Sequence, residues 1–274
     1  MSNQNLSNNS ASKSILITGC RNTGYAIARK LAELGYNIHF TSRSLDEAKA
    51  AEKALKSEYP NVNVYGYSLE QSDVKDIRRL FSEIRQNTET LDGFVANAAH
   101  LGVDLDIYNT DEEIFDTVIN TNVRGTFFCC QEASRLMAKS GGSIVIIGSV
   151  QSKGAVEGRT VYGISKAAVS TMAKYLAYDL APYHIRVNCL IAGAIHTERW
   201  DVLDEETLAK RRSAYPLGRE ADMEDIANGV QYLLTDLSKS TTGTELVIDS
   251  GLLVPILPYR DRKVTHHEDW EKNK

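Results

Sequence analysis

A tyrosine and a lysine stand four residues apart in Tyr162-Gly163-Ile164-Ser165-Lys166. At this spacing two side chains lie on the same face of a helix, so their polar ends can converge. A free phenol has a pKa of about 10 and exchanges protons poorly at pH 7. A neighbouring ammonium stabilises the phenolate and lowers that pKa towards the range in which acid–base catalysis is effective. The pair predicts an acid–base tyrosine, although many helices carry the same pair without any catalytic role.

The chain around this pair alternates between short apolar runs and helical patterns. Strands are expected at 14–18, 36–41, 62–67, 91–96, 143–148, 185–191 and 245–249, and helices at 25–34, 45–59, 74–86, 111–139 (open to a break), 162–180 and 222–234. Strict alternation predicts a parallel sheet covered on both faces. We therefore expect an α/β fold: a single Rossmann-like, doubly wound domain with a seven-stranded parallel sheet flanked by helices on both faces.

Three stretches fall outside that alternation. Residues 1–13 are rich in Asn and Ser and are predicted to be a disordered tail. Residues 196–218 follow the sixth expected strand, and an insertion at the carboxyl end of a strand lies over the ligand crevice of such a sheet. Residues 253–274 form a C-terminal extension. The predicted domain is therefore 14–252, with 196–218 as its substrate-loop insertion.

Composition narrows the classes of partner. The 274 residues are 42% hydrophobic and 24% charged, with a formal net charge of −5. Such a chain has no general attraction for nucleic acid or an anionic membrane, and no apolar run approaches the roughly 20 residues of a membrane helix. The four cysteines show no metal-ligand spacing. We expect reduced thiols, a cytoplasmic protein and no metal.

A glycine-containing turn joins the first expected strand to the first expected helix. A strand, such a turn and a helix N-terminus bind a pyrophosphate, because bare backbone lets it approach and the helix amides attract it. The stretch does not match Gly-x-Gly-x-x-Gly, so by itself it is weak support for a dinucleotide site. The predicted contacts in this turn are Thr18, Gly19, Arg21, Asn22, Thr23, Gly24 and Tyr25.

The second expected strand ends in Thr41-Ser42-Arg43. An NAD site would place Asp or Glu here to bind the ribose 2′-hydroxyl, whereas an arginine suits a 2′-phosphate. Ser42 and Arg43 are therefore predicted cofactor contacts, and Arg21 offers a second cation. We predict NADP(H) as the cofactor in preference to NAD(H). The alternative is that Arg43 is a solvated loop arginine.

Spaced motifs over residues 14–252 resemble those of the short-chain dehydrogenase/reductase family. The glycine turn is similar to the family's Thr-Gly-x-x-x-Gly-x-Gly, but it is one residue shorter and lacks the middle glycine. Three other segments resemble its Asn-Ala-Gly turn, the stretch that borders the nicotinamide and the closing strand: Asn97-Ala98-Ala99, 192–197 and 243–251. The resemblance implies four catalytic residues: Asn122, Ser149, Tyr162 and Lys166.

The resemblance also implies what these residues do. Tyr162 would donate a proton to the substrate oxygen, and Ser149 would hydrogen-bond that oxygen. Lys166 would lower the pKa of Tyr162 and hold the nicotinamide ribose, while Asn122 would fix a water that resupplies the proton. Further implied cofactor contacts, besides Tyr162 and Lys166, are Ser68 (in place of the family's acidic residue), Leu69, Asn97, Ala98, Ala99, Gly193, Ile195 and Thr197.

The implied reaction is a reversible hydride transfer between NADP(H) and a small-molecule carbonyl or secondary alcohol. Reduction of 3-oxoacyl thioesters is the commonest activity of similar chains, and a small-metabolite ketone is an equal alternative. The short glycine turn is similar to that of enoyl reductases, but these space their tyrosine and lysine further apart. An epimerising enzyme and a regulator without turnover also stay open. Substrate contacts are expected at 100–103, 151–156 and 196–217, and the family resemblance implies a homotetramer or a homodimer.

Overall fold

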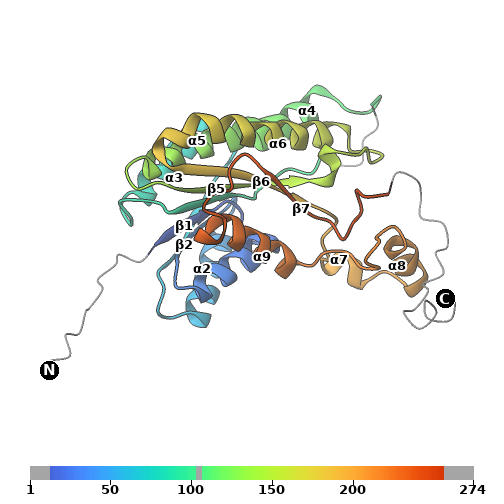
Figure 1. Ribbon diagram of the computed structural model, residues 1–274, viewed down its shortest axis with the longest axis horizontal. Coiled ribbons are helices and arrows are strands. Elements are labelled where there is room, and N and C mark those ends of the chain that lie inside the picture. The colour runs from blue at the N-terminus through green and yellow to red at the C-terminus, as the bar shows by residue number, and fades with distance from the viewer. Residues whose placement is uncertain (1–12, 103–106, 256–274) are drawn as a thin grey trace, which may run out of the picture.

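Seven parallel strands form one sheet in the order β3-β2-β1-β4-β5-β6-β7 in the computed structural model, which describes residues 13–102 and 107–255 (Figure 1). The strands are β1 Ser14–Ile17, β2 Asn37–Ser42, β3 Val64–Ser68, β4 Gly93–Ala96, β5 Gly142–Ser149, β6 Ile185–Ala192 and β7 Glu245–Ile248. Each strand lies within two residues of its expected range. The expected fold class is confirmed.

Helices cover both faces of this sheet (Figure 1). On one face lie α3 Val74–Ile84, α4 Glu112–Ile119, α5 Thr126–Met137 and α6 Thr160–Leu180. On the other lie α1 Thr23–Glu33, α2 Leu45–Glu58 and α9 Met223–Leu234. Each face buries its own apolar cluster, so the sheet is the middle layer between two cores. None of the described helices combines the length and apolar character needed to cross a bilayer.

Burial follows the sequence pattern in both kinds of element. All residues of β1 and β4 are buried because both faces of these central strands are covered. In α3 the buried side chains recur at helical spacing on one face: Val74, Ile77, Leu80, Phe81 and Ile84. The Asp73 carboxylate accepts a hydrogen bond from the Lys75 amide and so caps this helix.

The long helix expected at 111–139 is broken in the middle. Between α4 and α5, residues 120–125 form a π-helical segment, η1 (Asn120–Gly125). A Cβ on Gly125 would lie 2.2 Å from the carbonyl oxygen of Gln71, so only glycine allows this close approach. The π turn rotates the helix and buries Asn122, which is 2% exposed.

The segment 196–218 lies outside the sheet, beyond the ends of β6 and β7 (Figure 1). It contains two helices, α7 (Glu198–Asp201) and α8 (Glu205–Arg212). Four short turns complete the description: η1, η2 (Val150–Ser152), η3 (Ala181–Tyr183) and η4 (Asp236–Ser238). The tails predicted at 1–13 and 253–274 fall almost wholly outside the described residues, so the domain limits stay predictions.

Candidate active site

A cleft of about 870 Å³ opens at the carboxyl ends of the strands, around the point where the strand order reverses between β1 and β4. Parallel strands bring their carboxyl ends to one edge, which is where such sheets bind ligands. The predicted site residues that line the cleft are Gly19, Arg21, Asn22, Thr23, Ser42, Arg43, Leu69, Asn97, Ala98, Ala99, Ser149, Tyr162, Lys166, Gly193, Ile195 and Thr197. The site residues predicted from the sequence therefore make up half of those that line the cleft.

The glycine turn takes a tight path in spite of its missing residue. Gly19 has a φ of +85°, and Asn22, which precedes α1, has φ 47° and ψ −118°. A Cβ on Gly24 would lie 2.0 Å from the Gly19 carbonyl oxygen, so the first turn of α1 closes directly onto the end of β1. The α1 N-terminus is thereby brought to the cleft, where its amides can bind an anion.

Thr18 and Gly24 support this turn from beneath, since neither lines the cleft. The Thr18 hydroxyl accepts hydrogen bonds from the amides of Asn97, at 3.0 Å, and Ala98, at 3.1 Å. The Asn97 side chain donates to the Thr18 carbonyl at 3.0 Å. These bonds join the turns after β1 and β4, the two strands at the topological switch.

Ser149 and Tyr162 meet at the opposite end of the cleft. Ser149 ends β5, while Tyr162 lies in the first turn of α6. Burial raises the pKa of Tyr162, whereas a hydrogen bond with Ser149 and the positive charge of Arg159 lower it, with a net rise. Both hydroxyl-bearing residues line the same cleft, as a common donor pair for one substrate oxygen requires.

Lys166 is buried and lies over the Tyr162 ring, with its Nζ 5.6 Å from the ring centre. The ammonium donates a hydrogen bond to the Ile147 carbonyl at 2.7 Å. Burial lowers the pKa of Lys166 to about 8. We expected Lys166 to lower the pKa of Tyr162, but in this structure Arg159 is the cation that does so. The reason is that Lys166 is bonded to backbone and does not contact the phenol oxygen.

Asn122 does not line the cleft, and its amide is already bonded to protein. Its Oδ1 accepts from the His100 amide at 2.7 Å, and its Nδ2 donates to the His100 carbonyl at 2.8 Å and to Ser165 Oγ at 2.9 Å. The predicted role of Asn122 in fixing a water stays a prediction. Asn122 positions His100, which does line the cleft.

The opposite end of the cleft, beside Ser42 and Arg43, holds a carboxylate that sequence analysis missed. Glu47 of α2 lines the cleft, and its carboxylate accepts a hydrogen bond from Ser42 Oγ at 2.8 Å. It also lies 3.6 Å from the Arg21 guanidinium. Two of the predicted cofactor contacts, Ser42 and Arg21, are therefore engaged by one anion. Glu47 gave no signal in sequence because it is simply the third residue of an amphipathic helix.

The structure corrects two predicted cofactor contacts, because Tyr25 and Ser68 do not line the cleft. The Tyr25 hydroxyl donates to Glu58 at the end of α2, at 2.8 Å, since its position on α1 faces that helix. Ser68 is held by Arg79, which donates to its carbonyl at 2.8 Å. The substrate contacts expected at 151–156 do not line the cleft either, and residue 103 lies outside the described residues.

Comparison with known proteins shows the family to which this chain belongs. A family model described as enoyl-(acyl carrier protein) reductase matches residues 20–253. A 3-oxoacyl-[acyl-carrier-protein] reductase from Bos taurus is 34% identical over 235 residues, which are 85% of this chain and 94% of that protein. This chain belongs to the short-chain dehydrogenase/reductase family.

Solved structures of this family share the fold closely. The structure of ElxO with NADP bound has a TM-score of 0.82 and 29% identity, covering 89% of this chain and 100% of that one. NAD+-bound xylitol dehydrogenase has a TM-score of 0.81 and 25% identity, covering 87% and 98%. One of these structures thus holds NADP, which carries the 2′-phosphate, and the other holds NAD+, which does not.

The residues of this short-chain dehydrogenase/reductase fit such a dinucleotide. The Gly19–Gly24 contact leaves backbone amides at the cleft, which a pyrophosphate needs. Gln71 also lines the cleft, and its buried Oε1 has no hydrogen-bond partner, while its Nε2 donates to the carbonyls of Ala98 and Thr121. Over the described residues, no group of three or more His, Cys, Asp or Glu side chains could hold a metal ion. The metal-free reaction stays a prediction.

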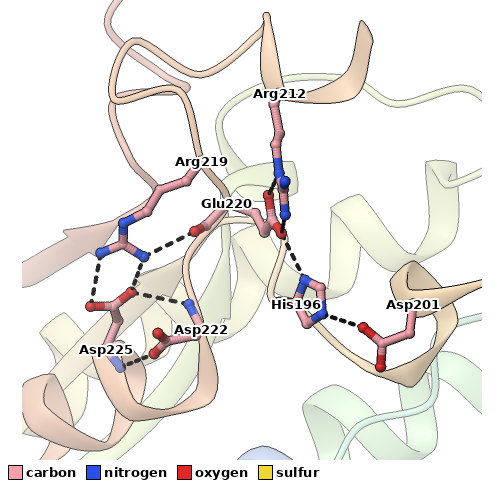
Figure 2. Close-up of polar contacts among 7 residues, drawn as sticks. All are labelled: His196, Asp201, Arg212, Arg219, Glu220, Asp222 and Asp225. Atoms are coloured by element: carbon pink, nitrogen blue, oxygen red, sulfur yellow. Dashed lines mark hydrogen bonds and ion pairs between the residues drawn. The ribbon is translucent and has the colours of Figure 1, made fainter. Parts of the chain in front are cut away.

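A polar cluster joins His196 to α7, to α8 and to the residues before α9 (Figure 2). His196 stands between Ile195 and Thr197, both of which line the cleft. Its two ring nitrogens each lie 2.7 Å from a carboxylate oxygen, one of Glu220 and one of Asp201 in α7. Both hydrogen bonds raise the pKa of His196, that with Glu220 the more. Only a protonated imidazole can donate to both carboxylates.

Glu220 is the centre of this cluster. It is 4% exposed and accepts two hydrogen bonds from the Arg212 guanidinium of α8, each at 2.8 Å. These bonds hold the pKa of Glu220 at about 2. The His196 amide also donates to the Ala221 carbonyl at 2.8 Å. The buried Glu220 carboxylate therefore joins α8 to His196, and His196 in turn joins α7.

Proposed function

We propose that this protein is an NADP(H)-dependent reductase that interconverts a small-molecule ketone and the corresponding secondary alcohol. The observation that carries the proposal is that Ser149, Tyr162 and Lys166 line one cleft together with the glycine turn that precedes α1. The Lys166 ammonium beside the phenol adds a fixed positive charge. Together these groups supply a proton donor, a second hydrogen-bond donor and a cation at one point.

The protein's own groups act on the oxygen of the substrate. When bound, the nicotinamide supplies the hydride. The Ser149 hydroxyl and the Tyr162 hydroxyl both donate hydrogen bonds to the carbonyl oxygen, and these bonds strengthen as negative charge develops there. Tyr162 then gives up its proton, and the positive charge of Arg159 stabilises the resulting phenolate. Thr197 and the Ile195 backbone would orient the carboxamide.

The choice of NADP(H) rests on Arg43, which lines the cleft directly after β2. A guanidinium binds a phosphate with paired, charge-assisted hydrogen bonds. The NADP-bound relative ElxO supports this choice, whereas the NAD+-bound xylitol dehydrogenase shows that the fold accepts the other cofactor. The Glu47 carboxylate would repel the negatively charged 2′-phosphate of NADP(H). We therefore expect only a moderate preference for NADP(H) over NAD(H).

The substrate we favour is a 3-oxoacyl thioester or a small-metabolite ketone. The bovine relative named as a 3-oxoacyl-[acyl-carrier-protein] reductase supports the first. Reduction of a C=C bond is the alternative that the matching family model's description raises. An epimerising enzyme and a cofactor-binding regulator without turnover are the remaining outcomes of the test below.

The test compares the wild type with Tyr162→Phe and the matched control Tyr175→Phe, a 71% exposed tyrosine of the same helix. Tyr162→Phe should bind NADPH normally and lose NADPH-dependent ketone reduction by about 10²- to 10⁴-fold. Tyr175→Phe should keep full activity. Product analysis with an enone separates C=O from C=C reduction. Undiminished ketone reduction in Tyr162→Phe would overturn the proposal, and NADPH binding without any turnover would favour the regulator.

We further propose that the enzyme is a homotetramer, or failing that a homodimer, built on α5 and α6, and that it works in the cytoplasm. Exposed aromatic side chains on these helices support the first: Phe127, Tyr175 and Tyr178 are 39%, 71% and 84% exposed. The four cysteines, all buried free thiols, fit a reducing compartment. Sedimentation equilibrium of the wild type and Tyr178→Lys tests the interface, and an unchanged mass in the variant would count against it.

A further inference from the structure

The residue that follows the Asn97-Ala98-Ala99 turn is a histidine whose backbone is held on both sides. The His100 amide donates to Asn122 Oδ1 at 2.7 Å, and its carbonyl accepts from Asn122 Nδ2 at 2.8 Å. Asn122 is 2% exposed and also bonded to Ser165 of α6. Because the buried Asn122 amide is bonded to both the amide and the carbonyl of His100, the position of the His100 Cα and Cβ atoms is fixed.

The next two residues are bound to the start of the catalytic helix. The Arg159 guanidinium donates to the carbonyls of Leu101, at 3.2 Å, and Gly102, at 2.5 Å. Arg159 stands three residues before Tyr162, and its charge lowers the Tyr162 pKa. The segment His100–Gly102 therefore lies against the N-terminus of α6, on the tyrosine side of the cleft.

The imidazole of His100 has one nitrogen left for a ligand. The Gly102 amide lies 3.1 Å from Nδ1, and a backbone N–H can only donate, so Nδ1 is the acceptor. A neutral imidazole with an accepting Nδ1 carries its proton on Nε2. His100 lines the cleft, and over the described residues no protein group is bonded to Nε2. The ring thus presents an N–H donor with a defined tautomer.

We propose that His100 is a substrate-specificity residue: its Nε2–H donates a hydrogen bond to a second oxygen of the substrate, close to the reacting carbonyl. The class of substrate is then a ketone with a neighbouring ester, thioester, keto or hydroxyl oxygen. This inference rests on the proposed function, because it assumes ketone reduction beside Ser149 and Tyr162. It adds a contact that selects among ketones and does not itself take part in the proton transfer.

Two probes of equal chain length test the contact: ethyl 3-oxobutanoate, which carries a second carbonyl, and 2-heptanone, which does not. The measured quantity is the ratio of kcat/KM for the first ketone to that for the second. Intrinsic reactivity cancels when this ratio is compared between variants. The KM for NADPH and the melting temperature are recorded alongside, to show that each variant is folded and binds cofactor.

Two substitutions separate the two nitrogens of the ring. His100→Asn keeps an acceptor near the Nδ1 position for the Gly102 amide but has nothing at Nε2. His100→Gln places an amide donor near the Nε2 position but loses that acceptor. If His100 makes one hydrogen bond to the substrate, the ratio of kcat/KM for the two ketones should fall by about three- to tenfold in His100→Asn. His100→Gln should restore this ratio at least in part. The KM for NADPH should stay unchanged in both variants.

The outcomes are distinguishable. An unchanged ratio in His100→Asn, or an equal loss on both ketones, would overturn the proposed contact while leaving ketone reduction intact. A loss confined to the KM for NADPH would overturn it too, by assigning His100 to the cofactor. If the wild type reduces neither ketone with NADPH, the proposed function fails first, and the inference that depends on it fails with it.

Discussion

The Lys166 ammonium lies 5.6 Å from the centre of the Tyr162 ring, yet it donates its hydrogen bond to the Ile147 carbonyl. The two members of the pair are therefore neighbours without being bonded to each other. Tyr162 is paired with Ser149, and Lys166 reaches past the ring to the end of β5. In this arrangement the lysine is free to exchange its backbone partner for a hydroxyl of a bound ribose.

This arrangement predicts a pH dependence of cofactor binding. Burial lowers the pKa of Lys166 to about 8, so the side chain is an ammonium below pH 8 and an amine above it. If the ammonium donates to the ribose, NADPH affinity should fall by about tenfold as the pH rises from 7 to 9.5. Fluorescence titration of NADPH measures this. Lys166→Met should bind weakly at every pH, and Lys174→Met, on the exposed face of α6, should behave as wild type. A flat wild-type profile would contradict the prediction.

The Gly19–Gly24 contact predicts a strict requirement for glycine. In Gly24→Ala the new Cβ would meet the Gly19 carbonyl at 2.0 Å, so the turn must open. We expect a loss of about 1–3 kcal/mol in unfolding free energy and at least about tenfold weaker NADPH binding. The control is Gly154→Ala, where an added Cβ meets nothing within 4 Å. Urea denaturation and cofactor titration give the two numbers. Similar behaviour of the two variants would show that the turn is more adaptable than its geometry indicates.

The Glu47 carboxylate predicts a way to shift cofactor preference. Because Glu47 lies beside Arg21, Glu47→Gln should free the Arg21 guanidinium for a 2′-phosphate and remove a repulsive charge. The ratio of kcat/KM for NADPH over NADH should rise by about tenfold, whereas Arg43→Ala should lower it. Asp46→Asn makes the same change of charge one residue away and should leave the ratio within about twofold. An unaltered ratio in Glu47→Gln would remove this carboxylate from the 2′ site.

The His196 cluster predicts that the segment over the cleft loosens at high pH. Its carboxylate partners raise the pKa of His196, so both hydrogen bonds are present below the unfolded value of about 6.5 and one is lost as pH rises through the folded value. Arg212 stays charged and keeps Glu220 ionised. Trypsin, which cuts after the basic run at 210–212 in α8, reports this opening.

Trypsin nicking of α8, corrected for the pH dependence of the protease on a free peptide, should therefore accelerate from pH 7 to pH 9 in the wild type by a few-fold. His196→Asn should be nicked quickly at both values. In Asp201→Asn the new amide can donate to a neutral imidazole, so the dependence on pH should flatten. Equal corrected rates at pH 7 and pH 9 in the wild type would show that His196 does not control this segment.

Local sequence patterns determined where the strands and helices of this protein lie, and they revealed the spacing of Tyr162 and Lys166 along one helix. Alternating apolar runs and helical periodicity predicted all seven strands within two residues, because burial on both faces of a sheet leaves a mark on each segment by itself. Tyr162 and Lys166 were found by spacing along one helix. Ser149, and the cleft wall at Asn97–Ala99, were found by resemblance to a family, since neither has a local signature of its own.

Tertiary structure alone decided which groups face one another. Glu47 meets Arg21, and Asn122 clamps His100, in each case between segments more than 20 residues apart in the chain. Tyr25 turns to α2 for the same reason, because its direction depends on how two helices pack. Spacing along a strand or helix specifies a side chain's face, whereas its partner depends on the packing of the whole sheet.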